Sequence, residues 1–262
     1  MQIVRTKRFL RTRLPLWAVR LYLRVRYGPP RLVYKSIVPE YIAIRQGQYF
    51  GQRCFIVGGG PSINQMDLTP LNDEYCMAVN RGFLLKDKGL HHVEFYGLSD
   101  IGAYTEYGRA VPADFAEHFC IFGEIPWDRN DVKNLSAFSM YTEHSNSKFM
   151  SKGFFQFDLT QPVAHTYTIA LQMLQIAVFA GFKDIYFIGV DNDFSGANMH
   201  FYPDSEKEKK NIKDWRFDPC PDNEKAFCSA NSILQPMGIN LYNAGVGGNL
   251  RALRRVDFKE LF

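Results

Sequence analysis

Ten residues decide the fold of this chain: Arg53-Cys54-Phe55-Ile56-Val57-Gly58-Gly59-Gly60-Pro61-Ser62. An apolar run stops at three glycines, a proline and a serine, and a polar helix start follows at Asn64. This order predicts a first β-strand, a tight turn that cradles a phosphate and the N-terminus of a helix. Glycines let backbone N–H groups approach an anion, and Pro61 suits a first helical turn. Ser62 adds a hydroxyl for phosphate or ribose.

The same loop excludes two common classes of nucleotide-binding protein. It lacks the lysine of a Walker loop, so a P-loop ATPase is not indicated. Pro61-Ser62 replaces the glycine spacing of a dinucleotide fingerprint, which argues against a typical NAD enzyme. A plain strand-to-helix turn without a ligand is the alternative to a nucleotide-binding loop.

Charge divides the chain of 262 residues into a basic head and an acidic body. Residues 1–50 hold eleven Lys and Arg but one acid, Glu40, so the head is about +10 and the remainder about −6. We expect residues 1–50 to be an amphipathic extension and 51–262 to be one catalytic domain. Five scattered cysteines without a CxxC pair indicate a reducing cytosol, and they favour neither disulfides nor a zinc site.

Residues 14–27 of the head read as an amphipathic helix rich in Arg, Trp and Tyr. This composition is typical of a helix lying on an anionic membrane surface. We therefore expect residues 5–35 to bind such a surface, with the protein cytoplasmic and peripheral on the inner membrane. The alternative is a basic helix packed on the body or on a second subunit in a homo-oligomer. No nucleic-acid module is recognised, and no stretch is long and apolar enough for a transmembrane helix.

Beyond residue 50 the sequence alternates between strand and helix patterns. We expect strands over 54–57, 75–79, 92–97, 119–122, 184–189 and 239–242, and helices over 64–69, 83–88, 166–180 and 223–235. The segments 123–160 and 195–222 look irregular and are expected to form a lid or acceptor-facing parts. Alternation of this kind predicts an α/β protein with a doubly wound, mostly parallel, Rossmann-like sheet in a single domain.

Ligands of such sheets bind beyond the carboxyl ends of the strands. Five polar segments fall at that edge: Gly58–Ser62, Asn80-Arg81, Ser99-Asp100, Asp191–Asp193 and Asn243–Gly248. Their convergence predicts one cleft. In it, Ser99 and Asp100 would contact donor or acceptor, and Arg81, Asn243 and Gly247 would lie against the nucleotide.

The order of these motifs resembles two related groups: the bacterial CMP-sialic acid sialyltransferases and the 6-hydroxymethylpterin diphosphokinase-like (MptE-like) family, with its polysaccharide-cluster branch. Both have a loop ending Gly-Pro-Ser, matched by Gly60-Pro61-Ser62, and an Asn after the second strand, matched by Asn80. The run Gly181-Phe182-Lys183-Asp184-Ile185-Tyr186 through Gly189 and Asp191, and the ending from Leu241 to Phe262, are also similar to these proteins. The likeness covers about 53–262 and implies a GT-A-like variant of the Rossmann fold.

The resemblance implies roles for particular residues. Gly58, Gly59, Gly60 and Asn80 would hold the nucleotide of a CMP-sugar, with Thr166 and Thr168 facing cytidine or phosphate. Tyr202 would bind the leaving phosphate and His200 would be the base, while Asp191 would contact ribose, base or sugar. One departure is that the sialyltransferases place Asn between the loop glycines, where this chain has Gly59.

A neutral imidazole suits the task of taking a proton from an acceptor hydroxyl, and His165 is a rival base. The first hypothesis is a glycosyltransferase without a metal or other cofactor. It would move a sialic-acid-like sugar or Kdo from CMP to a glycan or lipid-linked glycan. The second is a diphosphokinase that uses Mg-ATP, with Asp191 and Asp193 as magnesium ligands. The third is a non-catalytic nucleotide-binding scaffold.

Overall fold

The computed structural model describes residues 43–262, apart from 124, 128–131, 133, 142–154, 196–197 and 214–217. The basic head therefore lies outside the described residues. The strands are β1 Arg53–Val57, β2 Cys76–Val79, β3 Val93–Leu98, β4 Ala116–Phe122, β5 Leu135–Phe138, β6 Met140–Tyr141, β7 Val163–Ala164, β8 Asp184–Ile188, β9 Asn240–Asn243 and β10 Arg254–Arg255. The α-helices are α3 Ile101–Tyr107, α4 Ile169–Ala180, α5 Glu206–Lys213 and α6 Cys220–Leu234. The 3₁₀ helices are Pro61–Gln65, Thr69–Asp73, Asn80–Lys88, Gly108–Ala110, Gln235–Met237 and Phe258–Leu261.

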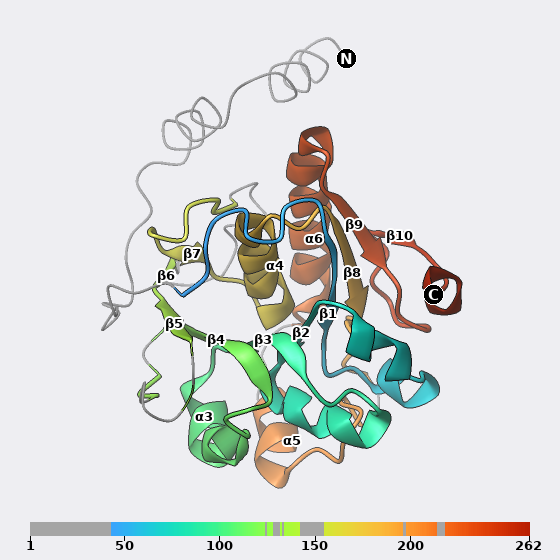
Figure 1. The fold of residues 1–262 in the computed structure, drawn as a ribbon. Coiled ribbons are helices and arrows are strands. Elements are labelled where there is room, and N and C mark those ends of the chain that lie inside the picture. Colours follow the sequence, from blue (N-terminus) through green and yellow to red (C-terminus); the bar gives the residue numbers. More distant parts are fainter. Residues whose placement is uncertain are drawn as a thin grey trace.

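Eight of the described strands form one sheet in the order β10-β9-β8-β1-β2-β3-β4-β5 (Figure 1). Every pairing within it is parallel. The chain leaves β1 toward β2 and β5, then returns at β8 on the other side of β1 and continues to β10. The order of strands therefore reverses between β1 and β8, and ligands of open α/β sheets bind at such a point.

The two faces of the sheet are covered by different kinds of helix. Alternate residues of a strand point to opposite faces, so Cys54 and Ile56 pack on one side while Phe55 and Val57 pack on the other. The first side is covered by α4 and α6, which are adjacent in Figure 1. Helix α4 is apolar nearly all round and mostly buried, as expected, and it begins after Thr168 and ends before Gly181 at φ +102°. These contacts hold the N-terminus of α4 at the carboxyl edge of the sheet.

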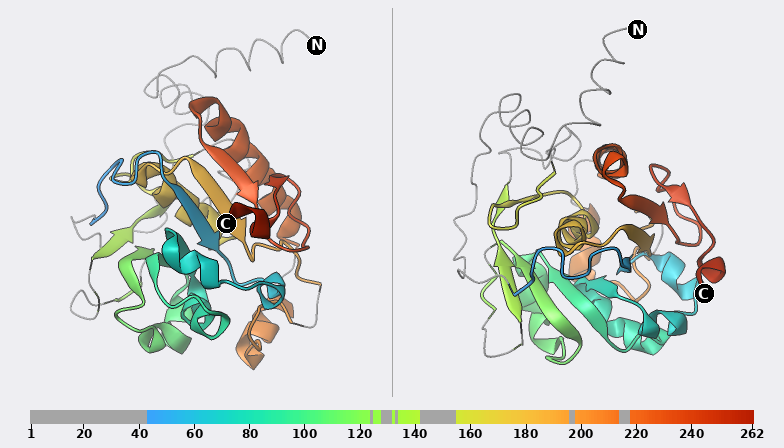
Figure 2. Two further views of the ribbon diagram at one scale, coloured as in Figure 1. Left: turned by 45° about the vertical axis from the view of Figure 1, so that its right-hand side comes forward. Right: turned by 45° about the horizontal axis from the view of Figure 1, so that its top comes forward.

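The second face is covered by 3₁₀ helices, α3 and the C-terminal turn. Phe262 stacks on Phe55, and Arg53 donates a hydrogen bond to the carbonyl of Leu261. Figure 2 shows the C-terminus beside the segment that follows β1. The end of the chain thus packs against the first strand.

The alternating α/β architecture and the parallel sheet are confirmed, but three local expectations were wrong. The short helix expected over 64–69 is replaced by two 3₁₀ helices, Pro61–Gln65 and Thr69–Asp73. Helix α3 was missed, although Asp100 caps it by accepting a hydrogen bond from the Ala103 amide. The segments 123–160 and 195–222 are not wholly irregular. β5 extends the main sheet, β6 pairs with β7 in a small second sheet, and α5 lies within the second segment. Tertiary pairing gave these short segments an order that their sequence pattern does not show.

Candidate functional site

The glycine loop meets the end of β8 at the switch point of the sheet. Gly60 donates a backbone hydrogen bond of 2.8 Å to the carbonyl of Gly189. A Cβ on Gly58 would lie 2.4 Å from the Gly189 oxygen, and a Cβ on Gly60 would lie 2.5 Å from an Asp191 carboxylate oxygen. Real side chains do not tolerate such distances, so these two glycines are required by the close approach of two backbones.

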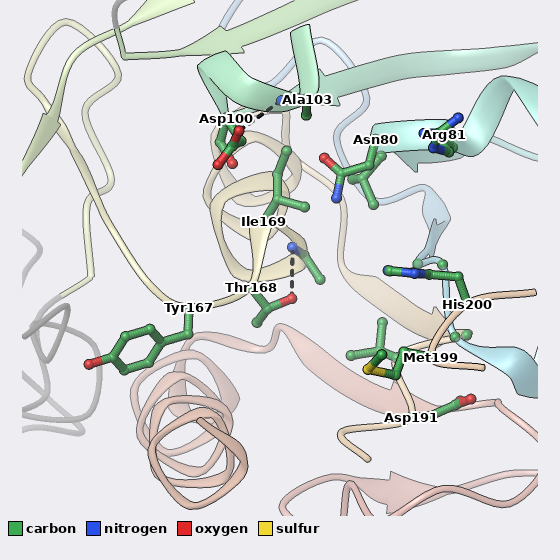
Figure 3. Close-up of a pocket in the computed structure, with 18 of the residues that line it drawn as sticks. Asn80, Arg81, Asp100, Ala103, Tyr167, Thr168, Ile169, Asp191, Met199 and His200 are labelled. Carbon is green, nitrogen blue, oxygen red and sulfur yellow. Dashed lines mark hydrogen bonds between the residues drawn. The ribbon is translucent and has the colours of Figure 1, made fainter. Parts of the chain in front are cut away.

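A cleft of about 450 Å³ opens above this junction. Of the predicted site residues, those that do not line it are Pro61, Ser62, Asn243 and Gly247. Figure 3 shows Asn80, Thr168 and His200 facing the same space from three different parts of the chain. The structure therefore brings most of the predicted residues together at one place.

Of these four residues, Ser62 and Asn243 are buried and bonded within the chain. Ser62 donates its amide to Asp191 Oδ2 at 2.9 Å and its hydroxyl to Asp191 Oδ1. Asn243 accepts from the Gly245 amide and donates to the Leu250 carbonyl, so its amide orders the C-terminal turn that includes Gly247. These polar groups are buried and satisfied by the protein itself.

His200 is paired with a buried carboxylate. Its Nδ1 donates a hydrogen bond to Asp204 Oδ1, and Asp204 Oδ2 accepts the amide of Met199 at 2.8 Å. The Asp204 side chain is 0% exposed. With Nδ1 carrying the proton, Nε2 of the neutral ring is an acceptor. Sequence reasoning left Asp204 without a role, although its position four residues after His200 was a usable signal.

The histidine ring is seated on the glycine loop. Phe201 donates its amide to the Gly59 carbonyl at 2.9 Å, and Asn64 holds the Phe201 carbonyl at 3.1 Å. A Cβ on Gly59 would lie 3.1 Å from His200 Cδ2. The ring of Tyr202 stacks on the His200 ring, with 4.8 Å between the two centroids. His200, the predicted base, and the glycine loop are therefore neighbours.

Arg81 is clamped in the cleft by charges and rings. Its guanidinium pairs with Glu106 and with Glu208, the latter at 3.2 Å, and lies over the rings of Tyr107 and Tyr202 at 4.4 and 5.4 Å. The two glutamates were not singled out from the sequence, because nothing in the linear order places them beside Arg81. Through Glu208, these contacts connect α5, which follows the His200 segment, to the residues just after the carboxyl end of β2.

Asn80 precedes this arginine in a left-handed backbone conformation, with φ of 53°. Its carbonyl accepts a 2.6 Å hydrogen bond from the Tyr96 hydroxyl. Ser99 and Asp100 line the cleft from the end of β3, and Asp100 Oδ1 is already bound to the Ala103 amide at 2.8 Å. The ends of β2 and β3 thus contribute an amide, a hydroxyl and a helix cap to the same wall.

The N-terminus of α4 faces the cleft opposite the glycine loop. Thr168 caps the helix through the Ala170 amide, and the Thr166 hydroxyl donates to the Thr168 carbonyl at 2.7 Å. Both hydroxyls are thus engaged within the chain, and their contact with a nucleotide stays a prediction. The positive end of the helix dipole attracts anions. Burial lowers the pKa of His165, which keeps this neighbouring ring neutral.

Asp193 is held by its own loop. Its carboxylate accepts hydrogen bonds from the amide and hydroxyl of Ser195 and from the Asn249 amide, so it shapes the loop after β8. The hydrogen bonds from Ser195 lower its pKa. Among the described residues, His, Cys, Asp and Glu side chains form no group of three that could hold a metal ion.

No protein-family model matches this sequence, and a comparison with curated proteins finds no match. The resemblance to the MptE-like family therefore stays a prediction. Solved structures similar to this chain include a MAf glycosyltransferase from Magnetospirillum magneticum AMB-1, at 16% identity and a TM-score of 0.47 over 84% of this chain. This chain spans only 36% of that protein's length.

Two sialyltransferase structures are also similar. One is the sialyltransferase CST-II in complex with a trisaccharide acceptor and CMP, at 15% identity and a TM-score of 0.45, covering 78% of this chain and 86% of that one. The other is a mammalian sialyltransferase at 10% identity and a TM-score of 0.44, covering 90% and 87%. The function proposed for this chain rests on the chemistry of its own cleft.

Proposed function

We propose that this protein is a glycosyltransferase that moves a keto-sugar acid, sialic-acid-like or Kdo, from CMP to a hydroxyl of a cell-surface glycan. The observation that carries the proposal is the His200–Asp204 pair seated on Gly59, within the glycine loop at the switch point of the sheet. This places a proton acceptor next to a loop suited to a phosphate, as transfer from a nucleotide-sugar requires.

In the proposed step, the acceptor oxygen attacks the anomeric carbon of the donor. Nε2 of His200 takes the proton from that hydroxyl, a new C–O bond forms, and the bond to the phosphate oxygen breaks with its electron pair leaving on CMP. Asp204 fixes the ring orientation and stabilises the imidazolium that results. Asp204 is thus a positioning residue, and His200 is the base.

The leaving phosphate needs hydrogen-bond donors and positive potential. The proposal assigns these to the glycine-loop amides, the N-terminus of α4 and the Tyr202 hydroxyl. Burial raises the pKa of Tyr202, so the hydroxyl keeps its proton and is able to donate. Arg81 adds a cation, which is paired with both Glu106 and Glu208. No step in this scheme requires a metal.

The carboxylates of the cleft do not oppose an anionic donor as strongly as their number suggests. Asp191 is bound to Ser62, and Asp100 to the amide of Ala103. The diphosphokinase alternative needs Asp191 and Asp193 for magnesium, and each carboxylate is already engaged by groups of the protein. We therefore favour sugar transfer over diphosphate transfer.

Incubation with CMP-sialic acid or CMP-Kdo, with CMP release as the readout, tests the proposal. We expect His200→Asn to slow release about 10²–10⁴-fold. Tyr202→Phe and Asp204→Asn should also slow it, whereas His91→Asn, on the exposed surface, serves as the matched control. Activity should survive EDTA, while a magnesium-dependent diphosphokinase would lose it. Absence of both CMP binding by calorimetry and CMP release by the wild type would overturn the proposal.

The proposed acceptor is a glycan or lipid-linked glycan built at the cytoplasmic face of the inner membrane. In the described part of the chain, no helix has the length and apolarity needed to span a bilayer. Peripheral attachment through residues 5–35 is therefore part of the proposal and has its own test in the Discussion.

A further inference from the structure

A second cavity, of about 700 Å³, lies beside the cleft at the loop after β8. Asn192, Asp193 and Phe194 line both spaces. The far walls come from the start of α6 and from the turn that carries Asn249 and Arg251. We call this second cavity the side groove. The three shared residues make the side groove a direct neighbour of the cleft that holds His200.

The side groove offers the groups that bind a polyhydroxylated ring. Phe194 is half-buried at the junction and offers an aromatic surface for the C–H face of a sugar. Asp218 accepts the amide of Cys220 and Glu224 accepts the amide of Arg251, so a ligand would share these oxygens with the chain. The Asn249 amide oxygen and the Arg251 guanidinium add an acceptor and a fork of donors. Pockets that orient small ligands combine an apolar surface with a few convergent polar groups in this way.

The charge of the side groove selects among sugars. Asp193, Asp218 and Glu224 bring three carboxylates, against the single guanidinium of Arg251 among the lining residues. Burial, aided by Asp218, raises the pKa of the Cys220 thiol to about 12, so this thiol adds no charge at neutral pH. The balance is negative, which disfavours an acceptor that carries its own carboxylate or phosphate.

An unsatisfied polar atom lies in the wall of the cleft, beside Asn192, which lines both spaces. Asn223 lines the cleft and is only 3% exposed, and its Oδ1 has no hydrogen-bond partner among the described residues. Its Nδ2 donates to Asn192 Oδ1 at 3.3 Å, and Asn192 in turn donates to the Cys220 carbonyl. A buried acceptor without a partner is costly, and a small shift of this amide would let a ligand hydroxyl supply the missing bond.

We infer that the side groove is the acceptor subsite and that it takes an uncharged, polyhydroxylated sugar, with one hydroxyl reaching past Asn223 to His200. The inference rests on the proposed glycosyl transfer. It goes further by naming the class of acceptor and the side from which the acceptor reaches the cleft.

The test uses p-nitrophenyl β-glucoside and p-nitrophenyl β-glucuronide, which differ only in a carboxylate. Binding of each to the CMP-saturated full-length protein is followed by ligand-observed NMR titration. We expect the glucoside to bind and the glucuronide to bind more weakly, by about fivefold for each uncompensated charge at close range. Asp218→Asn removes a negative charge and should reduce the ratio of the glucoside affinity to the glucuronide affinity. Arg251→Glu adds negative charge and should increase that ratio. Arg254→Glu, exposed on β10 outside the side groove, is the matched control and should leave it unchanged.

Two kinds of failure are distinguishable. If CMP itself does not bind, the proposed function has failed. If CMP binds but neither glycoside does, the acceptor assignment is overturned. Preference of the wild type for the glucuronide, or identical preferences in the wild type, Asp218→Asn and Arg251→Glu, would also overturn it, while the proposed sugar transfer would stand.

Discussion

Ser62 and Asp191 are 129 residues apart in the sequence and are joined by two hydrogen bonds, from the amide and from the hydroxyl of Ser62. Ser62 follows β1 and Asp191 follows β8, the neighbouring parallel strand. The pair therefore closes the switch point of the sheet under the cleft. A serine that the sequence suggests for a nucleotide is here engaged with a carboxylate of the protein.

Loss of the Asp191 carboxylate should destabilise the protein. Asp191→Ala leaves two buried donors of Ser62 without a partner, and we expect the free energy of unfolding to fall by about 1–3 kcal/mol. Ser62→Ala removes one donor together with its bond and should cost less. Urea unfolding of the two variants and the wild type measures both effects. An Asp191→Ala protein as stable as the wild type would contradict this account of the pair.

Two adjacent glycines should respond differently to alanine. In Gly60→Ala the new Cβ would lie 2.5 Å from Asp191 and 2.8 Å from the Gly189 carbonyl, so we expect a loss of stability of about 1–3 kcal/mol. In Gly59→Ala the new Cβ would lie 3.1 Å from His200 Cδ2, so the ring would be displaced slightly. We expect kcat to fall clearly while the free energy of unfolding changes little. Thermal unfolding and CMP release on both variants check the contrast. It fails if Gly59→Ala proves the less stable variant.

His118 should make stability depend on pH. This ring is stacked on Phe95, its Nε2 lies 3.9 Å from Glu94, and its Nδ1 has no hydrogen-bond partner among the described residues. Burial lowers its pKa despite the two nearby carboxylates of Glu94 and Glu117. The unfolded chain, with a histidine pKa of about 6.5, therefore takes up a proton before the folded one does.

The stability that neutral His118 contributes is therefore fully present above the unfolded pKa of about 6.5. It is lost as the pH falls from there toward the lowered pKa of the folded state. His165 acts in the same direction. We expect His118→Gln to flatten the fall in Tm between pH 7 and pH 5. The exposed control His91→Gln should retain the wild-type slope. An unchanged slope in His118→Gln would show that this ring does not titrate on unfolding.

The basic head predicts binding to anionic membranes. Residues 5–35 hold ten Lys and Arg and no acid, and each charge near such a surface contributes about 1 kcal/mol. Co-sedimentation with phosphatidylserine vesicles should pellet the full chain but not a version lacking residues 1–35. The binding should weaken in 1 M salt, where the Debye length is about 3 Å. Equal pelleting of the two proteins would leave a subunit contact as the role of the head.

Much of the fold could be predicted because its signals are local. Apolar β-branched runs stop at Gly58 and Gly189, and Gly181 ends an apolar helix, so the strand–helix alternation is written in short stretches. The short 3₁₀ turns, α3 and β5 were not predictable in the same way. Their few residues carry little periodicity, and their conformation depends on the strands and loops against which they pack.

The sequence by itself determined which residues follow the strands. Because the carboxyl ends of parallel strands all lie at one edge of the sheet, it also determined which residues gather there. Only the tertiary structure decided their partners. Asp204 lies close enough in sequence to His200 to have been considered, but its complete burial depends on the surrounding fold. The pairing of Asp191 with Ser62, the clamp on Arg81 and the side groove bring together segments far apart in the chain. Their geometry depends on how distant segments pack together, and the linear pattern of residues does not show this.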